Sequence, residues 1–131
     1  MKGYFDNIEK ATEDNELFRK LLYTGHNIQL VLMTIQPGEE IGAEVHDDRD
    51  QFFRFETGEG EVTVDDNVYA IKAYDAVIVP QGAGHNVRCT GSEPLKLYTI
   101  YGPPEHIDGT VHKTCAEAET SHEHFDGKTT E

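Results

Sequence analysis

The sequence predicts an all-β fold, a barrel or sandwich with short segments outside it at both ends. Short runs rich in β-branched, aromatic and other apolar residues follow one another from Phe18 to Tyr101, a pattern typical of sheets. Residues that favour turns separate these runs, for example Pro37-Gly38 and Asp65-Asp66-Asn67. The length of 131 residues suits one domain with a single hydrophobic core.

The strands are predicted from the apolar runs, and the turns from what lies between them. Gly and Asn in the intervening positions supply positive φ at little steric cost, and Pro removes a donor from the sheet. The predicted strands are 18–23, 28–36, 43–46, 51–56, 60–64, 68–71, 76–79, 85–90 and 95–101.

The two ends of the chain differ from this central region. Residues 1–16 form an N-terminal segment in which Ile8 to Glu16 can hold a helical turn, capped by Asn7 or Thr12. The barrel is expected over residues 17–102. Residues 103–131 become polar, and we expect them to wrap around the barrel, with a short helix at 115–118 and a disordered tail from residue 121. The His-Glu-His run in that tail is not expected to form a defined site.

The run 28–36 is informative about assembly, because a strand with one face in water alternates between apolar and polar residues. Here both faces are apolar: Ile28, Leu30 and Leu32 on one, and Val31, Met33 and Ile35 on the other. We expect either the N-terminal segment or a second subunit to cover one of these faces. A homodimer with Val31, Met33 or Ile35 near the interface is the prediction.

Charge and composition exclude several classes of function. The net charge of −14 argues against binding to nucleic acid or to anionic lipid, since both need Lys and Arg. Residues 39–66 hold eleven Asp and Glu against two Arg, typical of a solvated acidic surface. The polar start of the chain and the absence of a long apolar run predict no signal peptide and no membrane span. Two cysteines make no disulfide framework in a chain of this length, so the prediction is a reduced, cytoplasmic protein.

The first group of candidate functional residues lies at the third and fourth predicted strands. Glu44 and His46 project from the same face, because residues two apart in a strand do so. After the loop 47–50, the next strand begins at Gln51, which shares a face with Phe53. We expect these two strands to be neighbours, so that three polar side chains reach one wall of the interior. Such burial is costly unless the polar groups are paired or bind something.

The second group follows a glycine-rich turn. The sequence Pro80-Gln81-Gly82-Ala83-Gly84 leads directly into His85, which starts a strand with Val87 and Cys89 on the same face. The strongly apolar strand 76–79 precedes this turn, so His85 is expected to enter the barrel. Cys89 is expected to be a small core residue rather than a ligand or nucleophile.

Together the two groups resemble the two motifs of the cupin family. Gly38-x5-Glu44-x-His46-x4-Gln51-x6-Gly58 has the spacing of the first motif, whose usual ligands are His, His and Glu, and Pro80-x-Gly82-x2-His85 matches the heart of the second, which supplies a third His. The resemblance covers Val31 to Tyr101. It implies the cupin double-stranded β-helix, a jelly-roll barrel, with a metal inside the barrel mouth held by Glu44, His46, Gln51 and His85.

The sequence departs from the family pattern at four positions. Glu44 stands where His is usual, Gln51 where Glu is usual, Tyr74 where a Gly commonly opens the second motif, and Cys89 where an Asn closes it. With Glu44 in place of His and Gln51 in place of Glu, the four candidate ligands still include one carboxylate. Two imidazoles and a carboxylate suit divalent Fe, Mn, Zn or Ni, and the residue types do not choose among them. This variant resembles short bacterial and archaeal cupins, some of which are labelled mannose-6-phosphate isomerase-like.

The resemblance implies an enzyme or a binding module, and a third interpretation is an interaction protein whose site is only vestigial. The enzyme would act on a small polar metabolite, such as a sugar or a hydroxy or keto acid, by isomerase, lyase or dioxygenase chemistry. Arg54 and Arg88 alternate onto the faces opposite the ligands, which disfavours a phosphorylated sugar. His106, shortly after Pro103-Pro104, is the candidate catalytic acid or base if its loop covers the mouth. If that loop wraps the outside instead, a module that holds a metal or small ligand without turnover becomes the better interpretation.

Overall fold

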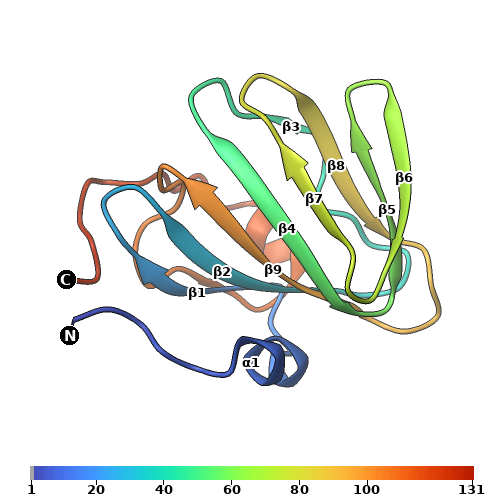
Figure 1. Ribbon diagram of the computed structural model, residues 1–131, viewed down its shortest axis with the longest axis horizontal. Coiled ribbons are helices and arrows are strands. Elements are labelled where there is room, and N and C mark those ends of the chain that lie inside the picture. The colour runs from blue at the N-terminus through green and yellow to red at the C-terminus, as the bar shows by residue number, and fades with distance from the viewer. Residues whose placement is uncertain (1) are drawn as a thin grey trace.

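The computed structural model describes residues 2–131 and consists mainly of two antiparallel sheets that face each other (Figure 1). The elements are α1 (Ile8–Asp14), β1 (Arg19–Thr24), β2 (Gln29–Ile35), β3 (Glu44–Val45), β4 (Asp50–Thr57), β5 (Glu59–Val64), β6 (Asn67–Lys72), β7 (Ala76–Val79), β8 (Gly84–Cys89), β9 (Leu95–Gly102), β10 (Val111–His112) and α2 (Cys115–Glu119). The all-β class is therefore confirmed, and β10 is a strand that the sequence did not predict.

The strand order shows how strands that follow one another in the sequence form a barrel. One sheet has the order β10-β1-β2-β9-β4-β7 and the other β3-β8-β5-β6. From β3 onward the chain passes repeatedly from one sheet to the other, as expected for a double-stranded jelly roll. The two inner faces thus enclose one interior.

The interior is apolar at one end and polar at the other. Met33, Phe55 and Leu97 from the larger sheet and Val62 and Val87 from the smaller one are fully buried at the apolar end. The polar end contains these buried residues: Arg19, Gln29, Gln51, His85 and Thr99. Because buried polar groups are costly without partners, this second end is where a functional site is expected.

The prediction that Val31, Met33 or Ile35 lies near a subunit interface is wrong. All three are fully buried in the core, because β2 lies between β1 and β9 with this face toward the other sheet. The opposite face is covered in part by the N-terminal segment. Helix α1 packs against β2, β4 and β9, and Asn15 Nδ2 donates to Thr34 Oγ1 at 3.2 Å.

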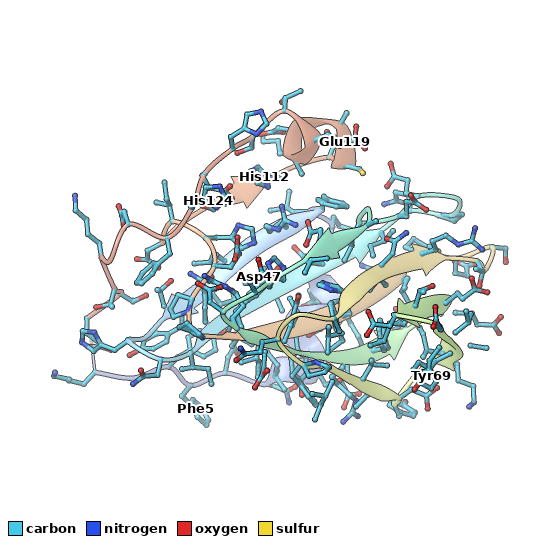
Figure 2. All side chains as sticks on the ribbon, turned by 90° about the horizontal axis from the view of Figure 1, so that it is seen from above. Phe5, Asp47, Tyr69, His112, Glu119 and His124 are labelled. Carbon is cyan, nitrogen blue, oxygen red and sulfur yellow. The ribbon has the colours of Figure 1, made fainter. Side chains whose placement is uncertain are left out.

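The C-terminal residues, expected to be disordered from residue 121, lie against the barrel instead. Phe125 N donates to Glu105 O at 2.9 Å, and Thr130 N donates to Thr24 O at 2.8 Å. Figure 2 shows this part of the chain along one side of the molecule, with His112, Glu119 and His124 labelled. Its polar composition gave no sign of these contacts, because the partners lie far away in the sequence.

Tyr74 shows why a glycine is usual at its position. Its φ is +76°, in the left-handed region that glycine adopts without strain and that other residues avoid. The Arg54 guanidinium lies over the Tyr74 ring, 5.8 Å from its centroid, which supplies a compensating contact.

No helix within residues 2–131 is long and apolar enough to cross a membrane.

Candidate metal centre

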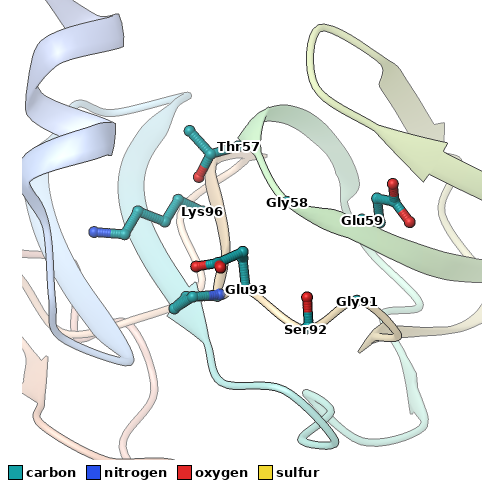
Figure 3. Close-up of a pocket in the computed structure, with 8 residues that line it drawn as sticks. Thr57, Gly58, Glu59, Gly91, Ser92, Glu93 and Lys96 are labelled. Atoms are coloured by element: carbon teal, nitrogen blue, oxygen red, sulfur yellow. The ribbon is translucent and has the colours of Figure 1, made fainter.

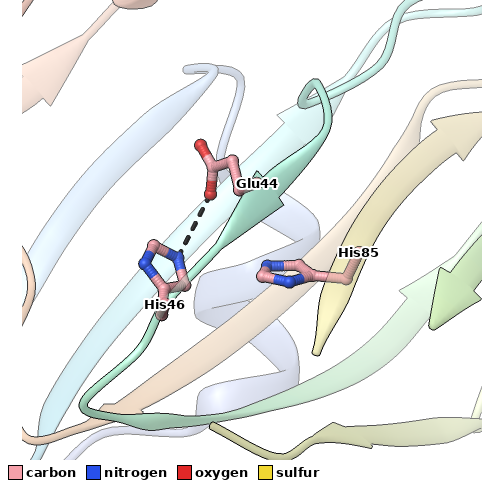
Figure 4. Close-up of side chains that lie close together, drawn as sticks. All are labelled: Glu44, His46 and His85. Atoms are coloured by element: carbon pink, nitrogen blue, oxygen red, sulfur yellow. Dashed lines mark ion pairs between the residues drawn. The ribbon is translucent and has the colours of Figure 1, made fainter. Parts of the chain in front are cut away.

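Two of the predicted ligands face each other across neighbouring strands of the smaller sheet. Glu44 in β3 pairs directly with His85 in β8, and His46 follows Glu44 two residues later on the same face. One donor atom from each of Glu44, His46 and His85 lies within 4.8 Å of the others. Figure 4 shows the three side chains converging, a spacing that allows one ion to contact all three.

His46 lies between two carboxylates. Its Nε2 is 3.2 Å from Glu44 Oε2, and its Nδ1 is 3.5 Å from Glu105 Oε2. Nε2 is buried, yet within residues 2–131 it has no hydrogen-bond partner of suitable geometry. A buried nitrogen of this kind is an available ligand atom.

The charges at this cluster favour a cation. Burial acts to raise the pKa of Glu44, but His46, Arg19 and His85 outweigh it and lower that pKa below its ordinary value. In turn the Glu44 carboxylate raises the pKa of His46, against the effect of burial. These two shifts show that the Glu44 carboxylate stabilises a positive charge beside it, and a metal ion can supply that charge in place of a proton on His46.

Both imidazoles are oriented through Nδ1. His85 Nδ1 lies 3.2 Å from Ala83 O, and His46 Nδ1 faces Glu105. Metal-bound histidines commonly donate the other ring N–H to a carbonyl or carboxylate, which fixes the tautomer and the ring orientation. The arrangement leaves Nε2 of each ring as the candidate ligand atom.

Gln51 lies on the opposite wall of the interior, which corrects the expectation that its strand neighbours β3. The strand β4 belongs to the larger sheet, because the loop after His46 crosses from one sheet to the other. Gln51 Nε2 donates to Thr99 Oγ1 at 2.9 Å, and Thr99 Oγ1 donates to Phe52 O at 2.8 Å. These hydrogen bonds fix the orientation of the Gln51 amide. Its Oε1 is buried and has no hydrogen-bond partner in the described part of the chain. Gln51 as a fourth ligand stays a prediction.

The residues present fit a divalent transition metal. Two imidazoles and one carboxylate converge, with an amide oxygen as a further candidate, and this donor set suits Fe, Mn, Zn or Ni. Two buried polar atoms, His46 Nε2 and Gln51 Oε1, make no hydrogen bond of suitable geometry among residues 2–131. A metal bound by these atoms would satisfy them.

His106 is buried, and it is separated from the cluster by Tyr101. His106 Nε2 lies 3.3 Å from Tyr101 Oη, and His106 Nδ1 lies 2.7 Å from Glu123 Oε1. The Tyr101 ring in turn meets the His46 ring edge-on, with centroids 5.9 Å apart. A row of side chains thus runs from the candidate ligands through Tyr101 and His106 to Glu123.

The loop that carries His106 is held in place by Gln29, which is fully buried. Gln29 Oε1 accepts the backbone N–H of Glu105 at 3.1 Å and of His106 at 2.9 Å. Gln29 Nε2 donates to His106 O at 2.9 Å. Arg49 pairs with Glu105, with Nε 3.1 Å from Oε2, so that the loops on either side of the mouth are joined.

Sequence reasoning missed Arg19, Tyr101, Glu105 and Glu123. Tyr101 and Arg19 lie on inward positions of predicted strands, so alternation alone could have found them. Glu123 belongs to the His-Glu-His run that was not expected to form a defined site. That expectation is wrong for Glu123, because the C-terminal segment folds back and brings its Oε1 to 2.7 Å from His106 Nδ1. The two arginines assigned to outer faces do lie there: Arg54 pairs with Glu56 at 3.4 Å and Arg88 with Glu61 at 3.4 Å.

A pocket of about 470 Å³ lies elsewhere and contains none of the candidate ligands. Thr57, Gly58 and Glu59 line one side of it, and the turn Gly91 to Pro94 lines the other (Figure 3). Gln51 is at the other end of β4. The candidate site is therefore identified by its donor chemistry.

Comparison with known proteins agrees with this architecture. A model of the cupin domain matches residues 31–101. The uncharacterized protein YrkC of Bacillus subtilis is 46% identical over 123 residues, which cover 89% of this chain and 66% of YrkC. The crystal structure of BH2720 from Bacillus halodurans has a TM-score of 0.90 at 44% identity and covers 92% of this chain and 96% of that one. The chain thus spans about two thirds of its curated relative.

A weaker similarity links the fold to a metal enzyme. A structure of Bacillus subtilis oxalate decarboxylase, described for its Mn(II) centres, has a TM-score of 0.56 and 26% identity. The match covers 59% of this chain but only 22% of that one.

Proposed function

Because the chain belongs to the cupin domain family, we propose that it is a metal-dependent enzyme that acts on a small polar metabolite inside the barrel. The observation that carries the proposal is the cluster of Glu44, His46 and His85, with donor atoms within 4.8 Å of one another. The row of Tyr101, His106 and Glu123 beside this cluster supports catalysis rather than storage. Isomerase, lyase and dioxygenase chemistry are all compatible with such a site.

The metal would be held by Glu44, His46 and His85, with Gln51 as the candidate fourth ligand. When bound, a divalent transition ion polarises a carbonyl or hydroxyl oxygen of the substrate as a Lewis acid. The similarity to a manganese-containing decarboxylase supports Mn(II) as one of the ions to test alongside Fe, Zn and Ni.

His106 would handle a proton through Tyr101. Glu123 Oε1 accepts a hydrogen bond from His106 Nδ1–H, which leaves Nε2 as an acceptor facing the Tyr101 hydroxyl at 3.3 Å. Burial raises the pKa of Tyr101 above its ordinary value, so the phenol keeps its proton and can act as a donor. This carboxylate, imidazole and hydroxyl arrangement follows the logic of a catalytic triad, in which the carboxylate orients the imidazole.

The competing function is a module that binds a metal or small ligand without turnover. Such a module needs the same ligands but no acid–base group. The buried position of His106, joined to Tyr101 within the molecule, favours the enzyme.

Metal analysis of the purified chain, followed by a substrate panel, tests the proposal. We expect about one transition ion per chain, since three ligands suffice for a catalytic site. The protein restored with that ion is then assayed against sugars, hydroxy acids and keto acids. Failure to retain or rebind any of the four ions would refute the metal-dependent function.

The variant His106→Asn distinguishes the two functions, an enzyme and a binding module without turnover. We expect turnover to fall by roughly 10²–10⁴-fold, the range for loss of a general acid or base, while metal content stays at the wild-type level. His122→Asn, in the exposed part of the tail, is the matched control and should leave both unchanged. Wild-type turnover in His106→Asn would remove this residue from the mechanism.

For assembly we propose a homodimer formed through the outer face of the larger sheet. Leu30, Ile100, Phe52 and Ile78 are register partners across β2, β9, β4 and β7, and Ile78 is 67% exposed. Sedimentation equilibrium at micromolar concentration is expected to show a dimer, and Ile78→Glu a monomer, because a charge there cannot be buried. A monomeric wild-type protein would contradict the proposal.

The cellular compartment is also part of the proposal. Cys89 and Cys115 are both free and buried, which suits a reducing compartment such as the cytoplasm.

A further inference from the structure

Within residues 2–131, Arg19 is a buried arginine without a carboxylate partner. It lies on β1 with 6% of its surface exposed. Its Nη1 is 3.0 Å from His112 Nδ1, and its guanidinium stands over the Phe18 ring at 5.4 Å. Its Nε is buried with no hydrogen-bond partner among residues 2–131, and none of its nitrogens lies within 4.0 Å of a carboxylate in that part of the chain. Arg54 and Arg88, in contrast, each pair with a glutamate.

His112 does not neutralise this charge. Burial and the neighbouring Arg19 lower the pKa of His112, so the imidazole is neutral and serves only as a hydrogen-bond acceptor. Arginine stays protonated in proteins, and a buried charge that lacks an opposite charge is costly. Among residues 2–131, the structure therefore keeps this positive charge out of direct contact with any carboxylate, although Glu44 and Glu119 line the same cavity.

The same arginine lines a cavity that reaches the candidate metal centre. The cavity has a volume of about 220 Å³, and Arg19 and Glu44 both line it, together with Cys115, Glu119 and Ser121 from the C-terminal segment. A molecule in this space can therefore meet Arg19 and Glu44, one of the three candidate metal ligands, at once.

We propose that Arg19 binds the carboxylate of a small organic acid, which makes the substrate of the proposed function a hydroxy or keto acid rather than a neutral sugar. This inference rests on that function. The planar guanidinium presents parallel N–H groups that match the two oxygens of a carboxylate, and the unpartnered Nε–H is one of them. A second oxygen on the acid, the hydroxyl or keto group, would then face the metal cluster.

The charges of the cavity favour a monoanion. Its walls hold one cation, Arg19, and two acidic residues, Glu44 and Glu119. A dianionic phosphate would meet more repulsion from these acids than a carboxylate. This agrees with the positions of the other arginines: Arg54 and Arg88 lie on outer faces, and Arg49 is paired with Glu105.

The test uses acids and their uncharged amides on the metal-loaded full chain. Calorimetry and thermal unfolding are measured with lactate and pyruvate, with lactamide and pyruvamide, and with inorganic phosphate. We expect at least one of the two acids to bind and to raise the melting temperature, and its amide and phosphate to bind at least roughly tenfold more weakly. Equal binding of acid and amide, or tighter binding of phosphate, would overturn the carboxylate assignment.

Variants of Arg19 assign the binding to this residue. Arg19→Met is expected to weaken the binding of the acid by roughly 10- to 100-fold, the effect of losing charged hydrogen bonds, and Arg19→Lys by a smaller factor because the charge remains without the planar fork. Arg88→Met, on the outer face of β8, is the control and should bind as the wild type does. Unchanged affinity in Arg19→Met, with or without a lower melting temperature, would give Arg19 a structural role and overturn the inference.

Metal content measured on the same samples separates this inference from the proposed function. Wild-type protein that binds metal but discriminates poorly between acid and amide would refute only the role of Arg19. Wild-type protein that takes up no metal would refute the metal-dependent function, and with it the substrate class inferred here.

Discussion

Replacing His85 with alanine is expected to remove most of the bound metal while the two sheets remain folded. His85 is a buried member of the three-residue cluster and pairs across the sheet with Glu44. Loss of a residue that merely orients a ligand costs about 10- to 100-fold in metal affinity, so loss of the ligand itself should cost roughly a hundredfold or more. His46→Ala should act in the same way.

Elemental analysis after gel filtration measures this loss, and far-ultraviolet circular dichroism checks that the β-sheet signal is retained. His26→Ala, an exposed histidine in the turn before β2, serves as the control and should keep full metal content. The metal-depleted variants should also unfold at a lower temperature than the metal-loaded wild type, because an ion that binds only the folded state stabilises it. Unchanged metal content in both His46→Ala and His85→Ala would show that the site is assigned to the wrong residues.

The second large effect is expected from Gly58→Ala, in the turn between β4 and β5. Gly58 has a φ of +90°, and a Cβ at this position would lie 2.5 Å from Pro94 O and 2.9 Å from the Leu95 Cα; Figure 3 shows the turn beside the 91–96 segment. The left-handed conformation costs an alanine about 1–2 kcal/mol, and the forced displacement of backbone about 1–3 kcal/mol more. The sum, about 2–5 kcal/mol, is a large part of a typical stability of about 5–15 kcal/mol.

Two other glycines separate the two contributions. Gly38 has a φ of +84°, with no described atom within 4 Å of its Cβ position beyond its immediate neighbours, so Gly38→Ala tests conformation alone. Gly60 is not in the left-handed region, yet its Cβ would lie 2.5 Å from Arg88 O, so Gly60→Ala tests close approach alone. Urea denaturation followed by circular dichroism should give Gly58→Ala the lowest midpoint of the three. Equal destabilisation of Gly58→Ala and Gly38→Ala would mean that the approach of Pro94 has no energetic consequence.

The fold could be predicted from the sequence because its determinants are local. Each predicted strand is present, with ends shifted by no more than a few residues, since alternation and turn residues act over a few positions. The same period of two places Glu44 and His46 on one face. The family spacing then brought His85 to the site, where Glu44 and His85 are indeed partners.

Tertiary structure decided what the local pattern left open. Both faces of β2 are apolar, and only the packing of the two sheets determined that Val31, Met33 and Ile35 form the core while the N-terminal segment covers part of the other face. Gln51 was expected on the same wall as Glu44, but the loop between them changes sheet.

The polar partners of the site were hidden for a related reason. His106 meets Glu123 across 17 positions of the chain, and Arg19 meets His112 across 93. Periodicity reports which way a side chain points within its own strand, whereas the identity of its partner depends on strands and loops that fold back from elsewhere. The sequence by itself therefore determined the strands and the types of the candidate ligands. Only the folded barrel decided which polar groups surround those ligands, because contacts between distant parts of the chain do not appear in the periodicity of the sequence.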